Sequence, residues 1–203
     1  MNRTVLVVGA GGREHALVRA LQRSPQRPHV ICAPGNAGIA RDAETVAISA
    51  TDNDALVALA RDRRVDLVVV GPEAPLVGGL CDALRAAGIR AFGPSGAAAR
   101  LEGSKAFAKE IMAAAGVPTA RSFTVTDADA GRRAIAELGL PVAVKADGLA
   151  AGKGVVVAQT ADEAHAALDA CLVERAFGDA GAAVVIEEGM SGPEVSLLAI
   201  CDG

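Results

Sequence analysis

Two lysines and three glycines lie close together in the segment KADGLAAGKG, residues 145–154. The apolar runs PVAV and VVVA flank this segment, and each run is typical of a short β-strand. A glycine-rich loop between two strands can fold over a polyphosphate, because glycine lets backbone N–H groups approach the phosphate oxygens closely. Lys145 ends the first strand and Lys153 lies in the loop, so both can neutralise phosphate charge. The segment therefore predicts a phosphate site, and it differs from the P-loop, whose G-x-x-x-x-G-K-[ST] pattern is not present.

Carboxylates are concentrated in a second segment, IEEGMSGPE, residues 186–194. Glu187 and Glu188 end one predicted strand, and Glu194 begins the next. The edge of a strand can present backbone N–H and C=O groups to an adenine, and nearby carboxylates can bind ribose hydroxyls. Acidic turns are common, so this segment supports a nucleotide site only in combination with the loop at 145–154.

Four further glycine-rich loops occur in the first hundred residues, and each follows a predicted strand. They are GAGGRE (9–14), PGNAG (34–38), GPEAP (71–75) and GPSG (93–96). In a parallel sheet the loops that follow the strands lie at the same carboxyl edge, which is where open α/β sheets bind ligands. We therefore expect a ligand site at this edge.

The first of these loops resembles a dinucleotide fingerprint, G-x-G-x-x-G, but Glu14 occupies the position of the third glycine. The second predicted strand ends in Cys32-Ala33-Pro34, without the acidic residue that binds a ribose. Both departures argue against NAD. The backbone N–H groups at the helix start, with Arg13 nearby, still suit one phosphate. Glu73 projects from a neighbouring loop, where its carboxylate could bind a hydroxyl or an amine.

Apolar runs alternate with helical patterns in the first part of the chain, which is typical of a parallel sheet covered on both faces. We expect strands at 4–9, 29–33, 66–71 and 89–93, with a further candidate at 44–49, and helices at 13–23, 52–62 and 76–88. The pattern changes after residue 103. There we expect helices at 104–116, from Thr126 to about Leu138 and from Thr160 to about Arg175, and strands at 141–144, 155–158, 182–189 and 194–203. This second part reads as an α+β module.

Helix starts are predicted from side chains that can accept the first free backbone N–H groups. Ser104 is a candidate N-cap. Capping boxes are predicted from three pairs of residues, Thr51 with Asp54, Thr126 with Asp129, and Thr160 with Glu163.

The composition excludes several classes of protein. Of the 203 residues, 51% are hydrophobic and 22% are charged, which is typical of a globular protein. The formal net charge is −4 and no basic block occurs, so we expect neither a nucleic-acid partner nor a membrane partner. Four separated cysteines, Cys32, Cys81, Cys171 and Cys201, predict buried thiols rather than a zinc site or disulfides. No apolar run is long enough to span a membrane, and we expect a cytoplasmic protein.

Eight stretches of the chain occur in an order that is informative when they are taken together. They are VVGAGGREHAL, APGNAG, VVVGPEAPLVGGL, FGPS, LEGSKAFAKE, VKADGLAAGKGVVVA, FGDAG and VIEE. In this order they resemble the phosphoribosylamine–glycine ligase (glycinamide ribonucleotide synthetase) family of the ATP-grasp superfamily. The resemblance implies an α/β fold. A Rossmann-like, pre-ATP-grasp domain with a parallel sheet would occupy residues 1–103 and bind phosphoribosylamine. Residues 104–203 would form the first, incomplete part of an ATP-grasp α+β nucleotide-binding module.

The resemblance also implies binding roles for particular residues. Lys105 and Lys145 would contact ATP phosphates, which a loop would cover with Asp147, Gly148, Gly152, Lys153 and Gly154. An adenine-binding strand edge would comprise Glu187, Glu188 and Gly189, although the family usually has a bulky apolar residue at 189, and Glu194 would bind ribose. Phosphoribosylamine would be held by Gly11, Gly12, Arg13, Gly35, Asn36, Ala37, Gly38, Gly71, Pro72 and Glu73.

The reaction implied by the family joins glycine to 5-phosphoribosylamine in purine biosynthesis, and releases ADP and phosphate from ATP through glycyl phosphate. The family's Mg²⁺ ligands and most of its glycine site have no counterpart in this sequence. We therefore expect this chain to be an inactive fragment, without metal ligands of its own, and no residue is assigned a catalytic role. His15 and His165 are interpreted as structural. The alternatives are another ATP-grasp carboxylate–amine ligase or carboxylase, and a nucleotide-binding module without catalysis.

Overall fold

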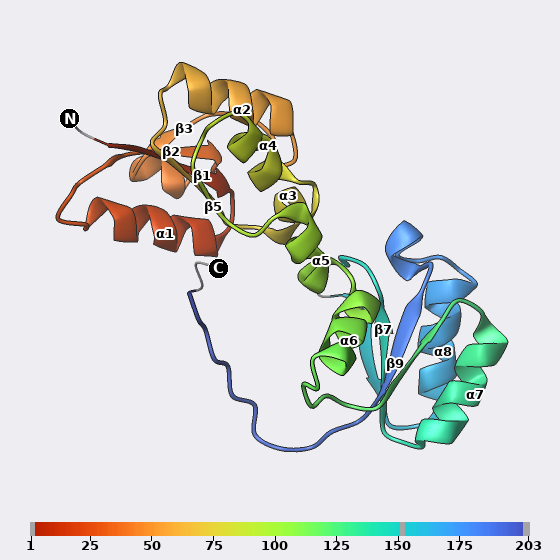
Figure 1. Ribbon diagram of the computed structural model, residues 1–203. Coiled ribbons are helices and arrows are strands. Elements are labelled where there is room, and N and C mark those ends of the chain that lie inside the picture. Colours follow the sequence, from red (N-terminus) through yellow and green to blue (C-terminus); the bar gives the residue numbers. More distant parts are fainter. Residues whose placement is uncertain (1–2, 151–152, 201–203) are drawn as a thin grey trace. The chain divides into compact units, whose positions relative to one another are not determined.

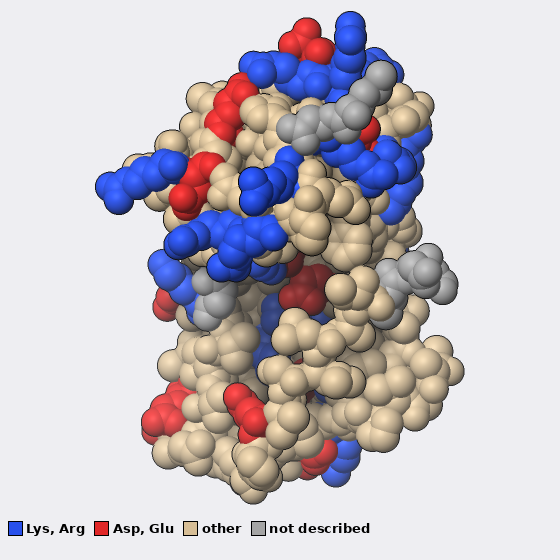
Figure 2. Space-filling model, turned by 90° about the vertical axis from the view of Figure 1, so that its left-hand side faces the viewer, with Lys and Arg blue, Asp and Glu red and all other residues tan. Residues whose placement is uncertain are grey.

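The computed structural model of the protein describes residues 3–150 and 153–200 (Figure 1). The chain divides into two compact units, Met1–Ala108 and Lys109–Gly203, and each unit has its own sheet and core. Side chains of both charge signs share the face drawn in Figure 2, as expected for a chain with 20 basic and 24 acidic residues.

The first unit is built on a five-stranded sheet in the order β3-β2-β1-β4-β5, and all its strand pairs are parallel. The central strands are apolar along their whole length because helices cover both faces of the sheet. The parallel sheet predicted for this part is confirmed, but the candidate strand at 44–49 shortens to two residues. The strands are β1 (Thr4–Gly9), β2 (His29–Pro34), β3 (Glu44–Thr45), β4 (Leu67–Val70) and β5 (Ala91–Phe92).

Alternation of side chains along β1 divides the core of the first unit between two faces. Leu6 and Val8 pack in one cluster with side chains of α2 (Asn53–Asp62) and α4 (Leu80–Ala86). Val7 packs in the other cluster with Val18 of α1 (Gly12–Gln22). The first unit also contains the 3₁₀ helix η1 (Ile39–Arg41), α3 (Glu73–Val77) and α5 (Gly96–Gly103).

The helix predicted at 76–88 is wrong, because two helices, α3 and α4, occupy this part of the chain. They are separated at Gly78 and Gly79, and Gly79 has a φ angle of +79°, a left-handed conformation that glycine adopts readily. The sequence analysis also missed α5. This helix begins after Ser95, whose Oγ accepts a hydrogen bond from the Ala98 N–H at 3.2 Å.

The second unit is built on a four-stranded sheet in the order β6-β9-β7-β8, and all its strand pairs are antiparallel. Its α7 and α8 cover one face of the sheet, where Ile135 and Leu168 join Val144 in the core. The predicted α+β module is therefore confirmed. No described helix is long and apolar enough to cross a membrane. The elements are α6 (Lys105–Ala114), which crosses the boundary between the units, β6 (Ser122–Val125), α7 (Ala128–Leu138), β7 (Val142–Ala146), β8 (Val155–Ala158), α8 (Ala161–Leu172), the 3₁₀ helix η2 (Gly178–Gly181) and β9 (Val184–Glu188).

The strand predicted at 194–203 is wrong as far as the structure describes it, since residues 191–200 have no regular secondary structure. The apolar side chains in this segment are exposed, and Leu197 is 94% exposed. A strand is held by hydrogen bonds to a neighbouring strand, and no described strand pairs with this segment. Residues 201–203, including Cys201, lie outside the described residues.

The other three cysteines are buried free thiols, as predicted. Burial raises the pKa of Cys32 to about 11, and it also raises the pKa values of Cys81 and Cys171. These thiols therefore stay protonated at neutral pH and pack as small apolar side chains.

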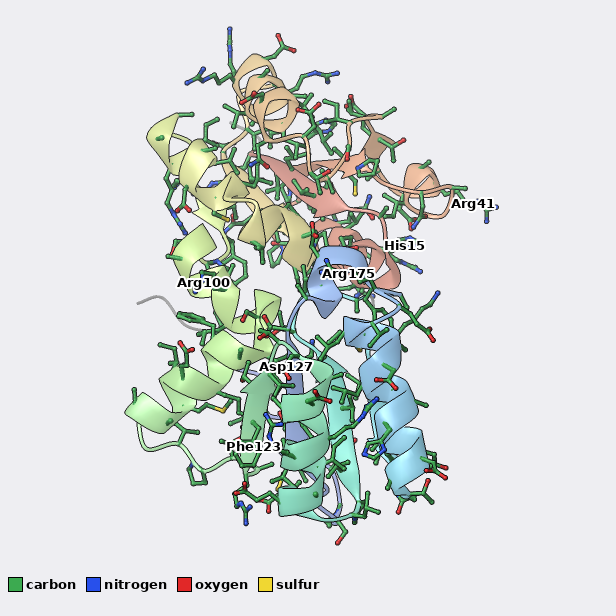
Figure 3. The ribbon with its side chains drawn as sticks, turned by 90° about the vertical axis from the view of Figure 1, so that its right-hand side faces the viewer. His15, Arg41, Arg100, Phe123, Asp127 and Arg175 are labelled. Carbon is green, nitrogen blue, oxygen red and sulfur yellow. The ribbon has the colours of Figure 1, made fainter. Side chains whose placement is uncertain are left out.

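Two of the three predicted capping boxes are wrong by one residue. The N-cap of α2 is Asp52, whose carboxylate accepts from the Ala55 N–H at 3.0 Å. The N-cap of α7 is Asp127, which lies at the N-terminal end of this helix (Figure 3) and accepts from the Ala130 N–H at 2.8 Å. In both cases a carboxylate replaces the predicted threonine, because its negative charge interacts favourably with the positive end of the helix dipole. The box of Thr160 and Glu163 at α8 is confirmed.

The corrected N-cap gives a stability prediction. Replacing Asp127 by alanine removes the acceptor of the Ala130 N–H, and we expect a loss of about 1 kcal/mol in the free energy of unfolding. Thr126→Ala is the matched control, and its effect should stay within about 0.5 kcal/mol because Thr126 is exposed and caps nothing. Urea unfolding of both variants followed by circular dichroism measures the difference. Equal losses would contradict the assignment of Asp127.

Candidate functional site

Three of the four glycine-rich loops of the first unit lie side by side at the carboxyl edge of its sheet, as the parallel topology predicts. The Gly35 N–H donates to the carbonyl oxygen of Gly9 at 3.1 Å, which joins the loop after β2 to the loop after β1. The Gly71 N–H donates to the carbonyl oxygen of Val8 at 3.0 Å, so the loop after β4 also follows β1 closely. The fourth loop is bound to α4 instead, through Gly96, whose N–H donates to the carboxylate of Asp82 at 2.7 Å.

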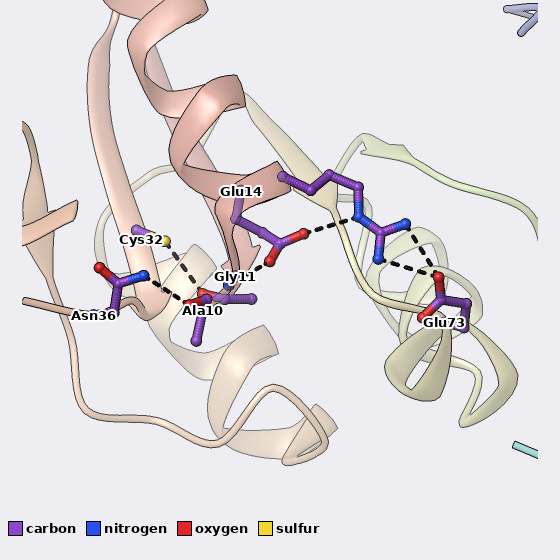
Figure 4. A network of polar contacts seen from close by, with 8 residues as sticks. Ala10, Gly11, Glu14, Cys32, Asn36 and Glu73 are labelled. Atoms are coloured by element: carbon purple, nitrogen blue, oxygen red, sulfur yellow. Dashed lines mark hydrogen bonds and ion pairs between the residues drawn. The ribbon is translucent and has the colours of Figure 1, made fainter. Parts of the chain in front are cut away.

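Asn36 holds two of these loops in a fixed arrangement (Figure 4). Its side-chain amide donates to the carbonyl oxygen of Ala10 at 2.7 Å. Its Oδ1 accepts from the backbone N–H groups of Gly38, at 2.7 Å, and Ile39, at 2.9 Å. Asn36 therefore shapes the loop from within, and the N–H of Gly38, one of the predicted substrate-binding residues, is engaged by this side chain.

Arg13 and Glu73, which sequence analysis assigned to the same substrate, form an ion pair with each other (Figure 4). Both Nη atoms of Arg13 lie 3.1 Å from Oε1 of Glu73. The hydrogen bonds that Arg13 donates to Glu73 raise the pKa of Arg13. The pKa of Glu73 is lowered first by a hydrogen bond that its carboxylate accepts from its own backbone N–H, and then by the contact with Arg13. Glu73 is the first residue of α3, although sequence analysis placed it in a loop. The two side chains are 59% and 37% exposed, so a ligand at this edge can reach both.

In the second unit, one face of the sheet carries two of the predicted nucleotide-binding side chains, Lys145 and Glu187. Val144 and Ile186 point into the core under α7 and α8, so the neighbouring Lys145 and Glu187 point to the opposite face. Val155 pairs with Lys145 and so lies on this face; it is 43% exposed. The face combines charged groups with accessible apolar surface, which is the combination that a nucleotide requires.

Glu187 is held between two lysines on this open face of the sheet. Its Oε2 lies 2.7 Å from Nζ of Lys145, and its Oε1 lies 3.3 Å from Nζ of Lys109. Lys109 also donates to Oγ1 of Thr119 at 2.7 Å and to the carbonyl oxygen of Ala120 at 2.9 Å. Two positive charges and one negative charge leave this group of three with a net charge of +1. Its side chains are only 12–24% exposed, so solvent screens this charge weakly.

Sequence analysis assigned Lys145 and Glu187 but missed Lys109. A signal for it was present in the segment LEGSKAFAKE, where Lys105 and Lys109 are four residues apart. This spacing places both lysines on one face of α6. The predicted N-cap of this helix, Ser104, is confirmed, since its Oγ accepts from the Phe107 N–H at 3.1 Å.

The predicted phosphate-covering loop is tied down at both ends. The Asp147 N–H donates to the carbonyl oxygen of Ala183 at 3.0 Å, and the Gly148 N–H donates to that of Ala180 at 3.0 Å. A Cβ atom on Gly148 would lie 2.8 Å from Ala180, which explains why glycine is required there. The Ala146 N–H donates to the carbonyl oxygen of Gly154 at 2.8 Å, while Lys153 is exposed. Gly152 lies outside the described residues.

At the predicted adenine-binding strand edge, Gly189 and Glu188 already make hydrogen bonds within the protein. The Gly189 N–H donates to the carbonyl oxygen of Pro141 at 2.7 Å, and a Cβ atom at 189 would lie 2.6 Å from Pro141. The Glu188 carboxylate accepts from the Arg121 N–H at 2.8 Å. Glu194 is exposed in the segment without secondary structure. Of these three predicted glutamates, Glu187 is the one that lies against Lys145 in the described structure.

Within residues 3–150 and 153–200, no cluster of three or more His, Cys, Asp or Glu side chains is suited to a metal ion. His15 pairs with a carboxylate, since its Nε2 lies 2.6 Å from Oδ2 of Asp42. This hydrogen bond lowers the pKa of Asp42. The pair connects α1 to the segment after η1, which agrees with a structural role for this histidine.

Two family models match the chain in succession. One is described as the N domain of phosphoribosylglycinamide synthetase and matches residues 3–102, and the other, its ATP-grasp (A) domain, matches residues 103–203. The phosphoribosylamine–glycine ligase of Mesorhizobium japonicum is 53% identical over 199 residues, which are 98% of this chain and 47% of that protein. The ligase of Streptomyces coelicolor is 56% identical, over 98% of this chain and 45% of its own. The chain thus spans about half the length of these relatives.

Solved structures agree with the sequence comparisons. The phosphoribosylamine–glycine ligase of Thermotoga maritima is 29% identical, with a TM-score of 0.77, over 94% of this chain and 44% of that one. An N5-carboxyaminoimidazole ribonucleotide synthetase from Thermus thermophilus is 21% identical, with a TM-score of 0.70, over 92% of this chain and 47% of its own. At that identity the second likeness shows the fold alone.

Proposed function

Because the chain belongs to the phosphoribosylglycinamide synthetase family, we propose that it carries the phosphoribosylamine and ATP sites of a phosphoribosylamine–glycine ligase. The proposed reaction joins glycine to 5-phosphoribosylamine and yields glycinamide ribonucleotide, ADP and phosphate. It belongs to purine biosynthesis and takes place in the cytoplasm. Residues 1–103 would form the substrate domain, and residues 104–203 the first part of the nucleotide-binding domain.

The group formed by Lys109, Glu187 and Lys145 is the observation that supports this proposal most strongly. A net charge of +1 on weakly exposed side chains is costly unless an anion approaches it. The triphosphate of ATP is such an anion, and Lys145 can exchange its contact with Glu187 for a phosphate oxygen. Val155 and the 60% exposed Val157, on the same face of the sheet, would contact the apolar surface of the adenine.

The first unit is better suited to the sugar phosphate. Its three adjacent loops present glycine backbone around Arg13 and Glu73. We assign the hydroxyl and amine groups of phosphoribosylamine to the Glu73 carboxylate and the phosphate to the loop backbone at the start of α1. Arg13 lies between the two, where it can stabilise a phosphate while it keeps Glu73 ionised.

The chemistry we propose requires positioning and charge neutralisation rather than a covalent nucleophile on the protein. The glycine carboxylate attacks the γ-phosphate of ATP, which forms glycyl phosphate and releases ADP. The amine of phosphoribosylamine then attacks the glycyl carbonyl and displaces phosphate. Mg²⁺ would neutralise the triphosphate in such a reaction, but the described residues form no cluster that could hold it, so no step is assigned to a metal held by them.

Two measurements on the purified chain test the proposal. Titration calorimetry with ATP in the presence of Mg²⁺, and separately with glycinamide ribonucleotide, should show saturable binding of each. ADP release is then measured with Mg²⁺, ATP, glycine and fresh phosphoribosylamine, omitting each substrate in turn. Turnover that requires all three substrates would demonstrate the ligase directly. ADP release that depends on bicarbonate and not on glycine would contradict the proposal. The absence of saturable binding of either ATP or glycinamide ribonucleotide would also contradict it.

A further inference from the structure

Glu14 is the only polar or charged residue that is buried within residues 3–150 and 153–200, at 3% exposure. It lies in the first turn of α1, directly after the loop that follows β1. A buried carboxylate is costly unless it is well paired, so its presence at this edge requires a reason. Sequence analysis used Glu14 only as evidence against a dinucleotide and gave it no role of its own.

Glycines at the ends of two strands make the space that Glu14 occupies. A Cβ atom on Gly9, at the end of β1, would lie 2.5 Å from Cγ of Glu14. A Cβ atom on Gly71, just after β4, would lie 2.2 Å from its Oε1. Both distances are below the 3.0 Å that non-bonded Cβ contacts essentially never fall under, so the backbone of both loops fits closely around this side chain. The carboxylate therefore lies between the carboxyl ends of β1 and β4, the central pair of strands at this sheet edge.

The contacts of Glu14 lead from the first loop to the ion pair of the substrate site (Figure 4). Its Oε2 accepts from the Gly11 N–H at 2.7 Å. Its Oε1 lies 3.3 Å from Nε of Arg13, which is an ion-pair distance, but this oxygen has no hydrogen-bond partner in the described structure. The opposite side of the same guanidinium donates both Nη groups to Glu73. One arginine is thus held between a buried carboxylate and an accessible one.

We propose that Glu14 is a positioning residue, which fixes the Arg13 guanidinium at Nε so that its two Nη groups hold Glu73 in the orientation that the sugar-phosphate substrate requires. This inference rests on the proposed function of the first unit. Arg13 is 59% exposed and would otherwise lose its orientation to solvent. Glu14 itself is buried and acts through Arg13, without contact with the substrate.

The test uses Glu14→Gln, which keeps an oxygen acceptor for the Gly11 N–H but removes the charge facing Arg13. With glycinamide ribonucleotide as the probe, we expect binding to weaken by about tenfold, while the dissociation constant of ATP stays within about twofold. Glu137→Gln is the matched control, since it makes the same change at a side chain that is 65% exposed in the second unit. Arg13→Lys gives a second route if Glu14→Gln does not fold, because lysine keeps the charge but cannot bridge two carboxylates. It should also weaken the probe by about tenfold.

A double-variant cycle shows whether Glu14 acts through Arg13. Glu14→Gln should weaken the probe in the wild-type background and have no further effect in the Arg13→Gln background. Full additivity of the two losses would overturn the proposal, and so would a dissociation constant within twofold of wild type for Glu14→Gln.

A ligand-free measurement separates this inference from the proposed function. The ¹⁵N–¹H signal of Arg13 Nε, assigned by its loss in Arg13→Gln, should shift or broaden in Glu14→Gln and stay in place in Glu137→Gln. An unchanged Arg13 signal in Glu14→Gln would overturn the positioning role whether or not the chain binds any nucleotide. If the signal responds as expected but wild-type chain does not bind glycinamide ribonucleotide, the positioning role stands and the assignment of the substrate is wrong.

Discussion

Lys145→Met is expected to weaken ATP binding by about 10- to 100-fold. A loss of this size corresponds to one hydrogen bond between charged groups, which contributes about 1.5–3 kcal/mol. Methionine keeps the length and the apolar stem of lysine but removes its charge. Glu187 would then pair with Lys109 alone, and the net charge of +1 that attracts the triphosphate would be lost. Calorimetric titration of the variant with ATP in Mg²⁺ measures the change.

His165→Ala is the control for this experiment. His165 lies on α8, which covers the opposite face of the sheet from Lys145. Its replacement should leave the dissociation constant of ATP within about twofold of wild type. If the two variants weakened ATP binding equally, Lys145 would not face the phosphates and the nucleotide site would have to be sought elsewhere.

Glu73→Gln is expected to affect the sugar-phosphate ligand and not ATP, the reverse of Lys145→Met. It should leave ATP binding unchanged within about twofold and weaken glycinamide ribonucleotide by about tenfold, since the amide can neither hold Arg13 as an ion pair nor accept as strongly from an amine. In an active ligase the same change should impair the use of phosphoribosylamine. Titration with each ligand in turn measures both effects.

Asp62→Asn provides the matched control for Glu73→Gln, because it also neutralises a carboxylate of the first unit, one that is 80% exposed. It should alter neither dissociation constant. A collapse of ATP affinity in Glu73→Gln, with the unfolding temperature preserved, would mean that the two ligands are not divided between the two units as we propose.

Most strands of the two sheets could be predicted because their signals are local, although β6 was not among the predicted strands. Runs of β-branched residues define β1 and β4, and the strand–loop–strand pattern around Lys145 gives β7 and β8. The errors occurred where local signals compete. At the start of α7 a threonine and an aspartate are adjacent, and charge decided in favour of Asp127. At Gly78 and Gly79 an apparently continuous helical pattern is interrupted by a left-handed residue, which hydrophobic periodicity does not detect.

Sequence predicts which loops of the candidate site lie together, but not which of their side chains form pairs. Parallel topology requires the loops after β1, β2 and β4 to share one edge, so their proximity follows from the sequence. The sequence does not show which side chains pair at that edge, because Arg13 and Glu73 are 60 residues apart and their contact depends on tertiary packing. The same holds for Glu187, whose two lysine partners come from another strand and from α6.

Hydrogen exchange measured by mass spectrometry, with and without saturating ATP and Mg²⁺, tests most directly the claim that ATP binds the sheet of the second unit. We predict slower exchange on ATP binding in peptides spanning 142–158 and 184–189, and no change in the loops at 9–14, 34–38 and 71–75. Glycinamide ribonucleotide should slow exchange in those three loops instead. Protection by ATP of the first-unit loops, with 142–158 and 184–189 unaffected, would contradict the account.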